Sequence, residues 1–173
     1  MRRKERAVTG LAAIAAILDD IHVCHLGLSD GEETYVVPVN FGYTLSKEGT
    51  LTLYFHGAPA GRKYSLLIQN GKAGFELDGR HALMVPEAKD NPCAYSFAYA
   101  SVIGSGAVRL LTDLSEKKAA LQSVMYHETG RNDFHFPDAA VSRTAVFALS
   151  AGWYTAKAHE APVMPASMGR KEV

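Results

Sequence analysis

Apolar residues recur with two different spacings along this chain of 173 residues, and these spacings predict short helices and longer strands. In Leu11–Asp19 the large apolar residues have helical spacing, and Thr9 is the expected N-cap. In His22–Leu28 they occupy every second position, so Cys24 and Leu28 share one face of a predicted strand. The pattern therefore predicts a sheet with a few helices packed against it.

The stretch from Tyr35 to Leu67 has the clearest order of elements. Its apolar segments Tyr35–Tyr43 and Leu51–His56 predict two strands joined by a turn. A loop of small residues, Gly57–Gly61, leads through a basic pair into a predicted helix over Tyr64–Asn70. This stretch holds most of the residues on which a function can be based.

Pro38 lies inside the first of these strands and cannot donate a ladder hydrogen bond. It indicates an edge strand, a bulge, or a place where a ligand takes over from a neighbouring strand. The remaining elements follow the same two spacings. We expect strands at Ala73–Leu77, Ala82–Val85, Phe97–Leu111 and Thr144–Ala158, and a helix over Glu116–Thr129 capped by Thr112 or Ser115.

Short turns between most neighbouring strands favour antiparallel pairing. Gly104 and Gly106 lie inside a long predicted strand and indicate a bend or bulge there. The expected fold class is therefore mainly β, a β-barrel with short helices, closed or partly split. We expect one domain over residues 1–160 and a tail over 161–173.

Composition excludes several classes of partner. Eighteen basic and 18 acidic residues give a formal net charge of zero, so nothing favours nucleic acid or an anionic membrane. No apolar run approaches the roughly 20 residues that span a bilayer, and the apolar run Leu11–Leu18 ends in Asp19–Asp20 without a cleavage-like site. Two cysteines form no disulfide framework. We expect a soluble cytoplasmic protein.

Arg62 and Lys63 open a predicted helix directly after the small-residue loop. Free backbone N–H groups at a helix start, the helix dipole and two cations together form a cradle for phosphate. Arginine adds bidentate geometry for phosphate oxygens. The simpler interpretation is a solvated basic pair, but cations at a helix N-terminus oppose the dipole when no anion is present.

His56 ends the strand before this loop. It could donate to a phosphate or a ring edge, act as an acid or base, bind a metal or haem, or bond only to backbone. Of the other histidines, His22 and His25 lie on opposite faces of a strand. A set built from His127, Glu128 and His135 matches no metal motif, so no metal site is expected.

The segments VVPVNFGY, LYFH, AGRK and SVIGSGAV, taken together, resemble the FMN-binding split-barrel superfamily of the pyridoxamine 5′-phosphate oxidases. Within it, the chain is most similar to the nitroimidazole-resistance (Nim-like) branch. The resemblance extends from the first helix to the strand of Trp153. It implies a homodimer with two FMN sites at the interface.

The resemblance also implies roles for single residues. His56 is the catalytic candidate; substrate class stays open, because Ala100 and His25 stand where basic residues are commoner. No arginine set for a pyridoxal phosphate substrate is present, so pyridoxamine phosphate oxidation is not expected. The implied cofactor contacts are the backbone of Val37, Pro38, Val39 and Asn40 at the ring, Phe55 and His56 beside it, Arg62 and Lys63 at the phosphate, and Ser101, Val102 and Trp153 from the partner subunit.

The predicted function is therefore an FMN-dependent oxidoreductase that reduces a small acceptor such as a nitroaromatic. One alternative is a haem- or flavin-binding carrier or sensor of the same fold, with His56 as an axial ligand. Another is a structural dimer that has lost its ligand. The electron donor and the choice among flavin, deazaflavin and haem stay open.

Overall fold

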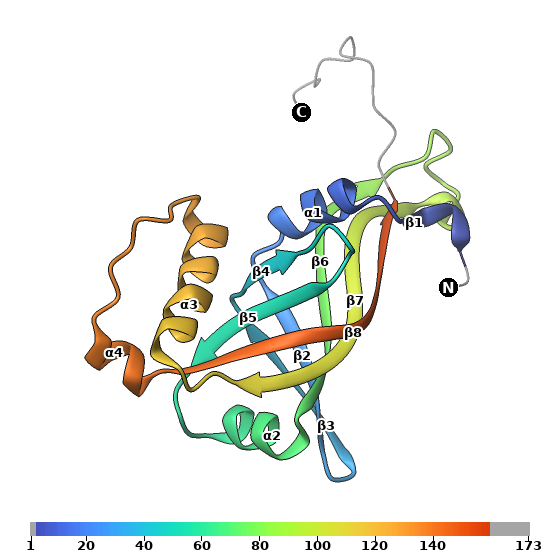
Figure 1. The fold of residues 1–173 in the computed structure, drawn as a ribbon. Helices are drawn as coiled ribbons and strands as arrows, with labels where there is room; N and C mark the ends of the chain where they lie inside the picture. The colour runs from blue at the N-terminus through green and yellow to red at the C-terminus, as the bar shows by residue number, and fades with distance from the viewer. Residues whose placement is uncertain (1–2, 160–173) are drawn as a thin grey trace, which may run out of the picture.

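The computed structural model describes residues 3–159, which form one antiparallel sheet curled into a split barrel (Figure 1). The strand order is β3-β2-β6-β7-β8-β5-β4, and β1 pairs with β8 beside this path. The strands are β1 Ala7–Val8, β2 Cys24–Asp30, β3 Glu33–Val39, β4 Gly42–Leu45, β5 Leu51–Gly57, β6 Lys72–Met84, β7 Ser96–Leu110 and β8 Ala145–His159.

Four α-helices cover parts of this sheet, and none of the described helices is long and apolar enough to cross a membrane. α1 lies over one end of the barrel, α2 lies at the opposite end, and α3 and α4 lie against its side (Figure 1). The helices are α1 Leu11–Asp19, α2 Arg62–Asn70, α3 Leu114–Thr129 and α4 Asp138–Arg143, with 3-10 turns at Lys4–Arg6 and Pro92–Ala94.

The inward-facing side chains of the strands fill the barrel. Phe55 of β5 is 0% exposed and stacks on Phe147 of β8, with ring centroids 5.6 Å apart. Ile17 and Leu18 of α1 complete this core at one end. A second cluster lies outside the barrel, where α3 and α4 cover Val146 and neighbouring residues. The first part of β8 is therefore buried on both faces, and its sequence is a continuous apolar run instead of an alternating one.

Several sequence predictions are confirmed. The first helix spans Leu11–Asp19 as expected, although Gly10 is its N-cap and no side chain, including that of Thr9, caps it. Pro38 lies on the edge strand β3. The glycine pair of β7 lies at an irregularity, as it indicated: the register shifts between Ser105 and Gly106, with Gly152 of β8 as the extra residue. The mainly β split-barrel fold class is correct.

The predicted strand Tyr35–Tyr43 is wrong, because the chain leaves the sheet after Val39 and re-enters it as β4 at the other end of the strand order. Phe41 is fully buried at this crossing. Gly42 packs directly on α3, where an added Cβ would lie well inside 3.0 Å of the backbone of Ser123 and Val124. The predicted strand is therefore divided by the burial of Phe41 and by the close packing of Gly42 on α3. The alternation of residues along the sequence does not reveal either contact.

Other boundaries also differ from the prediction. The strands predicted at Ala73–Leu77 and Ala82–Val85 are one strand, β6, in which a register shift between Gly79 and Ala82 takes up the extra residues. α3 begins at Leu114, and its cap is Asp113, whose carboxylate accepts from the Glu116 amide, rather than Thr112 or Ser115. The short elements β1 and α4 were not predicted, and the predicted tail, 161–173, lies outside the described residues.

The close approach at Gly42 gives a test of the fold. Gly42→Ala forces α3 away from β4 and should lower the free energy of unfolding by about 1–3 kcal/mol, the usual cost of overpacking. Gly152→Ala is the matched control, because its added Cβ meets nothing nearer than 3.7 Å. Urea denaturation of both variants measures the effect. Equal stability of the two variants would contradict the described packing of α3.

Candidate functional site

The start of α2 is built to leave backbone donors free. Gly61 precedes it with φ 98° and ψ 172°, a conformation that favours glycine. The first turn contains Arg62, Lys63 and Tyr64, has no acidic residue, and has no side-chain cap. The first N–H groups of a helix have no partner within the helix. They therefore remain available to an anion, and the helix dipole favours one.

Arg62 is present at this helix start but already has anionic partners. Its Nε lies 2.7 Å from Asp30 Oδ2, and its Nη2 lies 2.9 Å from Glu33 Oε2. The guanidinium also lies 4.7 Å from the centre of the Tyr35 ring. Hydrogen bonds to Asp30 and Glu33 raise the pKa of Arg62 above its ordinary value. The Arg62 side chain thus links the start of α2 to the tip of the β2–β3 hairpin.

Lys63 and His56 meet at the other side of the helix start. Lys63 Nζ donates to the backbone oxygen of His56 over 3.3 Å and has no carboxylate partner in the described chain. A Cβ on Gly57 would lie 2.8 Å from this Nζ, so glycine there leaves room for the ammonium. Partial burial lowers the pKa of Lys63. Of the two basic residues, Lys63 is therefore the one whose charge is available to an anion.

The His56 side chain reaches solvent, because alternation along β5 turns Phe55 inward and His56 outward. Partial desolvation and the charge of Lys63 lower the pKa of His56 below its ordinary value. The ring is therefore mainly neutral at pH 7. A neutral imidazole offers one N–H donor and one acceptor nitrogen.

The predicted ring contacts on β3 point in two directions. Val37 and Val39 face the core, and Pro38 faces outward on the unpaired edge. Asn40 is already used by the fold: its Nδ2 lies 3.0 Å from the backbone oxygen of His22 and 3.3 Å from Glu128 Oε1. The backbone of the segment, rather than its side chains, is thus what β3 presents to a ligand.

The remaining predicted contacts lie elsewhere. Phe55 and Val102 are 0% exposed, so only their backbone can meet a ligand at the surface. Trp153 is 56% exposed on the outer face of β8. His56 pairs with Val146 of the same strand, seven residues from Trp153, or about 23 Å along β8. One chain therefore does not bring His56 and Trp153 together.

Ser101 lies on the same outer face as Trp153, and the middle of this face contains a strip of small residues, Gly27, Gly74 and Ser105, which we call the glycine strip. The strand registers align Val36, Gly27, Gly74, Ser105 and Trp153 in one row across β3, β2, β6, β7 and β8. A Cβ on either glycine would meet nothing nearer than 3.8 Å. Packing within this chain therefore does not require glycine at these two positions.

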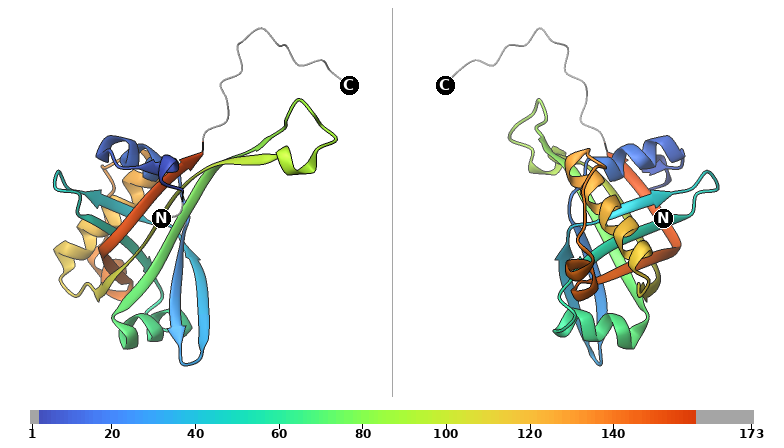
Figure 2. Two further views of the ribbon diagram at one scale, coloured as in Figure 1. Left: turned by 90° about the vertical axis from the view of Figure 1, so that its right-hand side faces the viewer. Right: turned by 60° about the vertical axis from the view of Figure 1, so that its left-hand side comes forward.

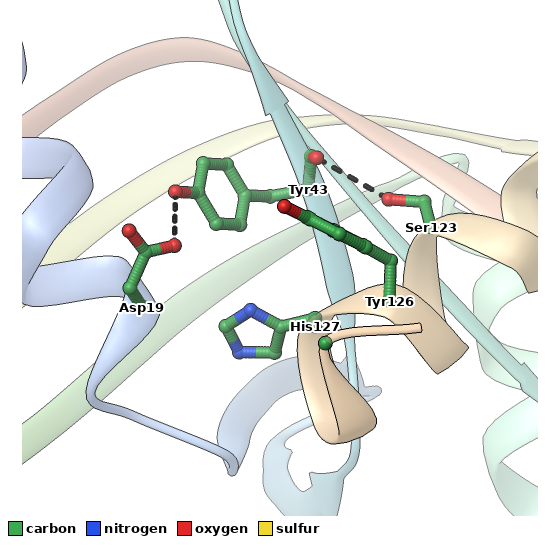
Figure 3. A pocket seen from close by; sticks show the side chains of 6 residues that line it. Asp19, Tyr43, Ser123, Tyr126 and His127 are labelled. Atoms are coloured by element: carbon green, nitrogen blue, oxygen red, sulfur yellow. Dashed lines mark hydrogen bonds between the residues drawn. The ribbon is translucent and has the colours of Figure 1, made fainter. Parts of the chain in front are cut away.

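Sequence analysis missed a cavity of about 410 Å³ between α1, β4 and α3 (Figure 3). Tyr43 lines this cavity, with its hydroxyl 2.6 Å from Asp19 Oδ1. Burial and the Asp19 carboxylate raise the pKa of Tyr43. The lining residues come from three distant segments, and no spacing along the sequence connects them. They are Asp19, Tyr43, Ser123, Tyr126, His127 and Gly130.

Two groups of possible metal ligands also lie close together in the described residues. One joins His127 and Glu128 to His22, in place of the His135 that the sequence suggested. The other is His25, Glu76 and Asp78 on the outer face of β2 and β6. His22 and His25 belong to different groups, as expected, although His22 lies before β2 rather than on it, and alternation could not show that α3 brings new partners to His22.

Comparisons with solved structures agree with the split-barrel fold. A candidate 5-nitroimidazole antibiotic resistance protein from Bacteroides thetaiotaomicron is 30% identical, with a TM-score of 0.74 over 88% of this chain and 86% of that one. The flavocytochrome Anf3 from Azotobacter vinelandii (20% identity, TM-score 0.74, 96% and 75% covered) shares the fold. So does an FAD and haem binding protein from Mycobacterium smegmatis (18%, 0.77, 90% and 74%).

No curated protein sequence matches the chain. A family model described as pyridoxamine 5′-phosphate oxidase matches residues 11–158, which is most of the chain. Together with the nitroimidazole-resistance relative, this match agrees with the motifs around Pro38, His56 and Arg62. The chain therefore belongs to the pyridoxamine 5′-phosphate oxidase family, in its nitroimidazole-resistance branch.

Proposed function

We propose that the protein is a cytoplasmic, homodimeric, FMN-dependent oxidoreductase that reduces a small acceptor such as a nitroaromatic compound. The observation that carries the proposal is the α2 start, where uncapped N–H groups and Lys63 adjoin His56 in a chain of this family. Similarity to a nitroimidazole-resistance protein supports the acceptor class. Bound FMN supplies the redox chemistry, and the protein supplies binding and orientation.

The phosphate is assigned to the α2 start. The Lys63 ammonium and the first helix N–H groups would hold it by charge-assisted hydrogen bonds. Arg62 would also contact the phosphate while it keeps its hydrogen bonds to Asp30 and Glu33, because these two carboxylates fix the position of its guanidinium. The residues present therefore fit a phosphate, with Lys63 as the main charged contact.

The ring is assigned to the outer edge of β3. Pro38 lies five residues from Glu33, or about 17 Å along the strand from the hairpin tip that holds Arg62. A flavin mononucleotide, whose phosphate and ring are separated by a ribityl chain, has this elongated form. The unpaired backbone of β3 offers its free donors and acceptors to the polar ring edge.

His56 is assigned to the acceptor side of the flavin as a hydrogen-bond donor. Its lowered pKa keeps the imidazole neutral near pH 7, so it can donate N–H without adding a second cation beside Lys63. The backbone contact with Lys63 links its position to the phosphate site. We therefore assign to His56 the orientation of the acceptor by an N–H hydrogen bond.

A second copy of the chain is assigned to the outer face of the sheet. Exposed apolar residues lie there beside the glycine strip, and others lie on the arm formed by the far ends of β6 and β7, which projects from the barrel (Figure 2). Such residues are typical of a protein interface. They are Val36, Leu83, Val85, Tyr95, Phe97, Ile103 and Trp153. A partner lying on the face would also bring its Ser101 and Trp153 near the first chain's flavin.

A carrier or sensor that binds haem is the second candidate. The solvent-facing, neutral imidazole of His56 suits an axial haem ligand. Two structural neighbours are described as flavin and haem proteins, although their identity of 20% or less supports only the fold. The visible spectrum separates a haem protein from a flavoprotein.

Loss of the cations at the α2 start should weaken FMN binding. Lys63→Ala should raise the FMN Kd about ten- to hundredfold, since a charge-assisted hydrogen bond contributes about 1.5–3 kcal/mol, and the double variant Arg62→Ala/Lys63→Ala should raise it further. Fluorescence titration of FMN measures the change. Lys72→Ala is the control, an exposed lysine just beyond the same helix. Unchanged affinity in the double variant would exclude the phosphate assignment.

His56→Ala should reduce the rate of nitroaromatic reduction about tenfold, the effect of losing one hydrogen bond of about 1.4 kcal/mol, and leave the FMN Kd within about threefold. Because the pKa of His56 is lowered, the wild-type rate should be flat above pH 6.5 and fall as the pH drops through this pKa. His56→Ala should lack that acidic decrease. His81→Ala, another exposed histidine, is the control. A pH profile identical in wild type and His56→Ala would contradict the assignment.

Bulk on the glycine strip should prevent dimer formation. Gly74→Leu has room for its Cβ within the chain, so it should fold but obstruct a partner lying on the face. Light scattering after size exclusion should give a monomer, whereas Ala13→Leu, which places a leucine on the exposed side of α1, should stay dimeric. A dimeric Gly74→Leu would place the interface elsewhere.

A further inference from the structure

His22, His127 and Glu128 converge from two separate parts of the chain. His22 lies between α1 and β2, and the other two lie in the last turn of α3. One ligand atom from each lies within 4.8 Å of those from the other two. Nδ1 of His22 is 3.3 Å from Glu128 Oε2, and the two imidazole rings have centroids 5.5 Å apart.

A hydrogen bond fixes the orientation of the His127 imidazole. Its Nε2 lies 2.8 Å from the backbone oxygen of Ile21, which can only accept. Nε2 therefore carries the ring proton, and in the neutral ring Nδ1 has the free lone pair. Phe41 packs on the same ring, with centroids 4.5 Å apart. A backbone carbonyl that holds the second nitrogen is the usual outer support of a metal-binding histidine. Figure 3 shows this imidazole beside the cavity.

The Glu128 carboxylate is also supported from outside the group. Asn40 Nδ2 donates to Glu128 Oε1 over 3.3 Å, so Oε2 is left on the side of His22. The same amide lies 3.0 Å from the backbone oxygen of His22. One side chain on the β3–β4 crossing thus positions both the carboxylate and the backbone of His22.

We infer that His22, His127 and Glu128 form a binding site for a divalent transition-metal ion, with Zn²⁺ as the best match. Two imidazoles and one carboxylate are a known zinc ligand set that leaves a fourth position to water. Zinc bonds of about 2.0–2.2 Å place tetrahedral ligands about 3.3 Å apart. His22 Nδ1 and Glu128 Oε2 already have this separation, and the separations to His127, up to 4.8 Å, must shorten. The exposed His22 side chain is free to make that movement.

The second group, His25, Glu76 and Asp78, fits this ion less well. It offers one imidazole, which suits zinc, and two carboxylates that oppose each other's charge. Burial and the neighbouring Asp78 raise the pKa of Glu76, which favours a proton there. His25 is also a solvent-exposed histidine beside a glutamate, 3.3 Å away, which makes it a matched control for His22.

The test is calorimetric titration of the full chain with ZnCl₂, without a histidine tag, repeated with CoCl₂ to read the visible bands of tetrahedral Co²⁺. We expect one ion per chain. His22→Ala and Glu128→Gln should each weaken binding at least tenfold, and His25→Ala should change it less than twofold. His22→Gln is a second variant at the same exposed position and should weaken binding in the same way. A thermal unfolding temperature in EDTA equal to that of the wild type shows that each variant is folded.

Three results would overturn the inference: no binding to the wild type, unchanged binding in the His22 and Glu128 variants, or equal loss in His25→Ala. The first or second would leave the three residues as a hydrogen-bonded link between α3 and the chain before β2. The measurement is independent of the proposed flavin chemistry. His22→Ala should keep its FMN affinity, and Lys63→Ala should keep its zinc affinity.

Discussion

The inward packing of Phe55 on Phe147 determines what the rest of the barrel can present to a ligand. Because side chains alternate along a strand, burying Phe55 turns His56 outward at the start of the loop to α2. Along β8 the register shift beside Ser105 adds Gly152 and changes the alternation by one residue, so Trp153 faces outward, far from His56. The barrel core thus separates the histidine from the tryptophan within one chain, and a flavin that meets both positions requires a second chain.

The two basic residues at the start of α2 have different roles. Arg62 has two carboxylate partners and holds the helix against the β2–β3 hairpin, which is a structural role. Lys63 meets only a backbone oxygen, beside N–H groups that no side chain caps. A basic pair in a sequence gives no sign of this division, because Asp30 and Glu33 lie about thirty residues earlier. The structure therefore changes the emphasis of the phosphate proposal from the pair to the lysine.

Sequence patterns predicted the features that depend on neighbours along the chain. The extent of the first helix, the edge position of Pro38 and the bulge at Gly106 all follow from local spacing or backbone chemistry. Features that depend on distant packing were missed. The division of Tyr35–Tyr43 follows from Gly42 meeting α3, and the grouping of His22 with Glu128 needs the end of the same helix. Tertiary contact, rather than propensity, decided each of these.

The central claim is that this chain binds FMN, and the visible absorption spectrum of the freshly purified protein tests it most directly. The spectrum should be recorded again after FMN is added and the excess removed. We predict flavin bands at about one flavin per chain. A haem spectrum, or a colourless protein that retains no added FMN, would contradict the account.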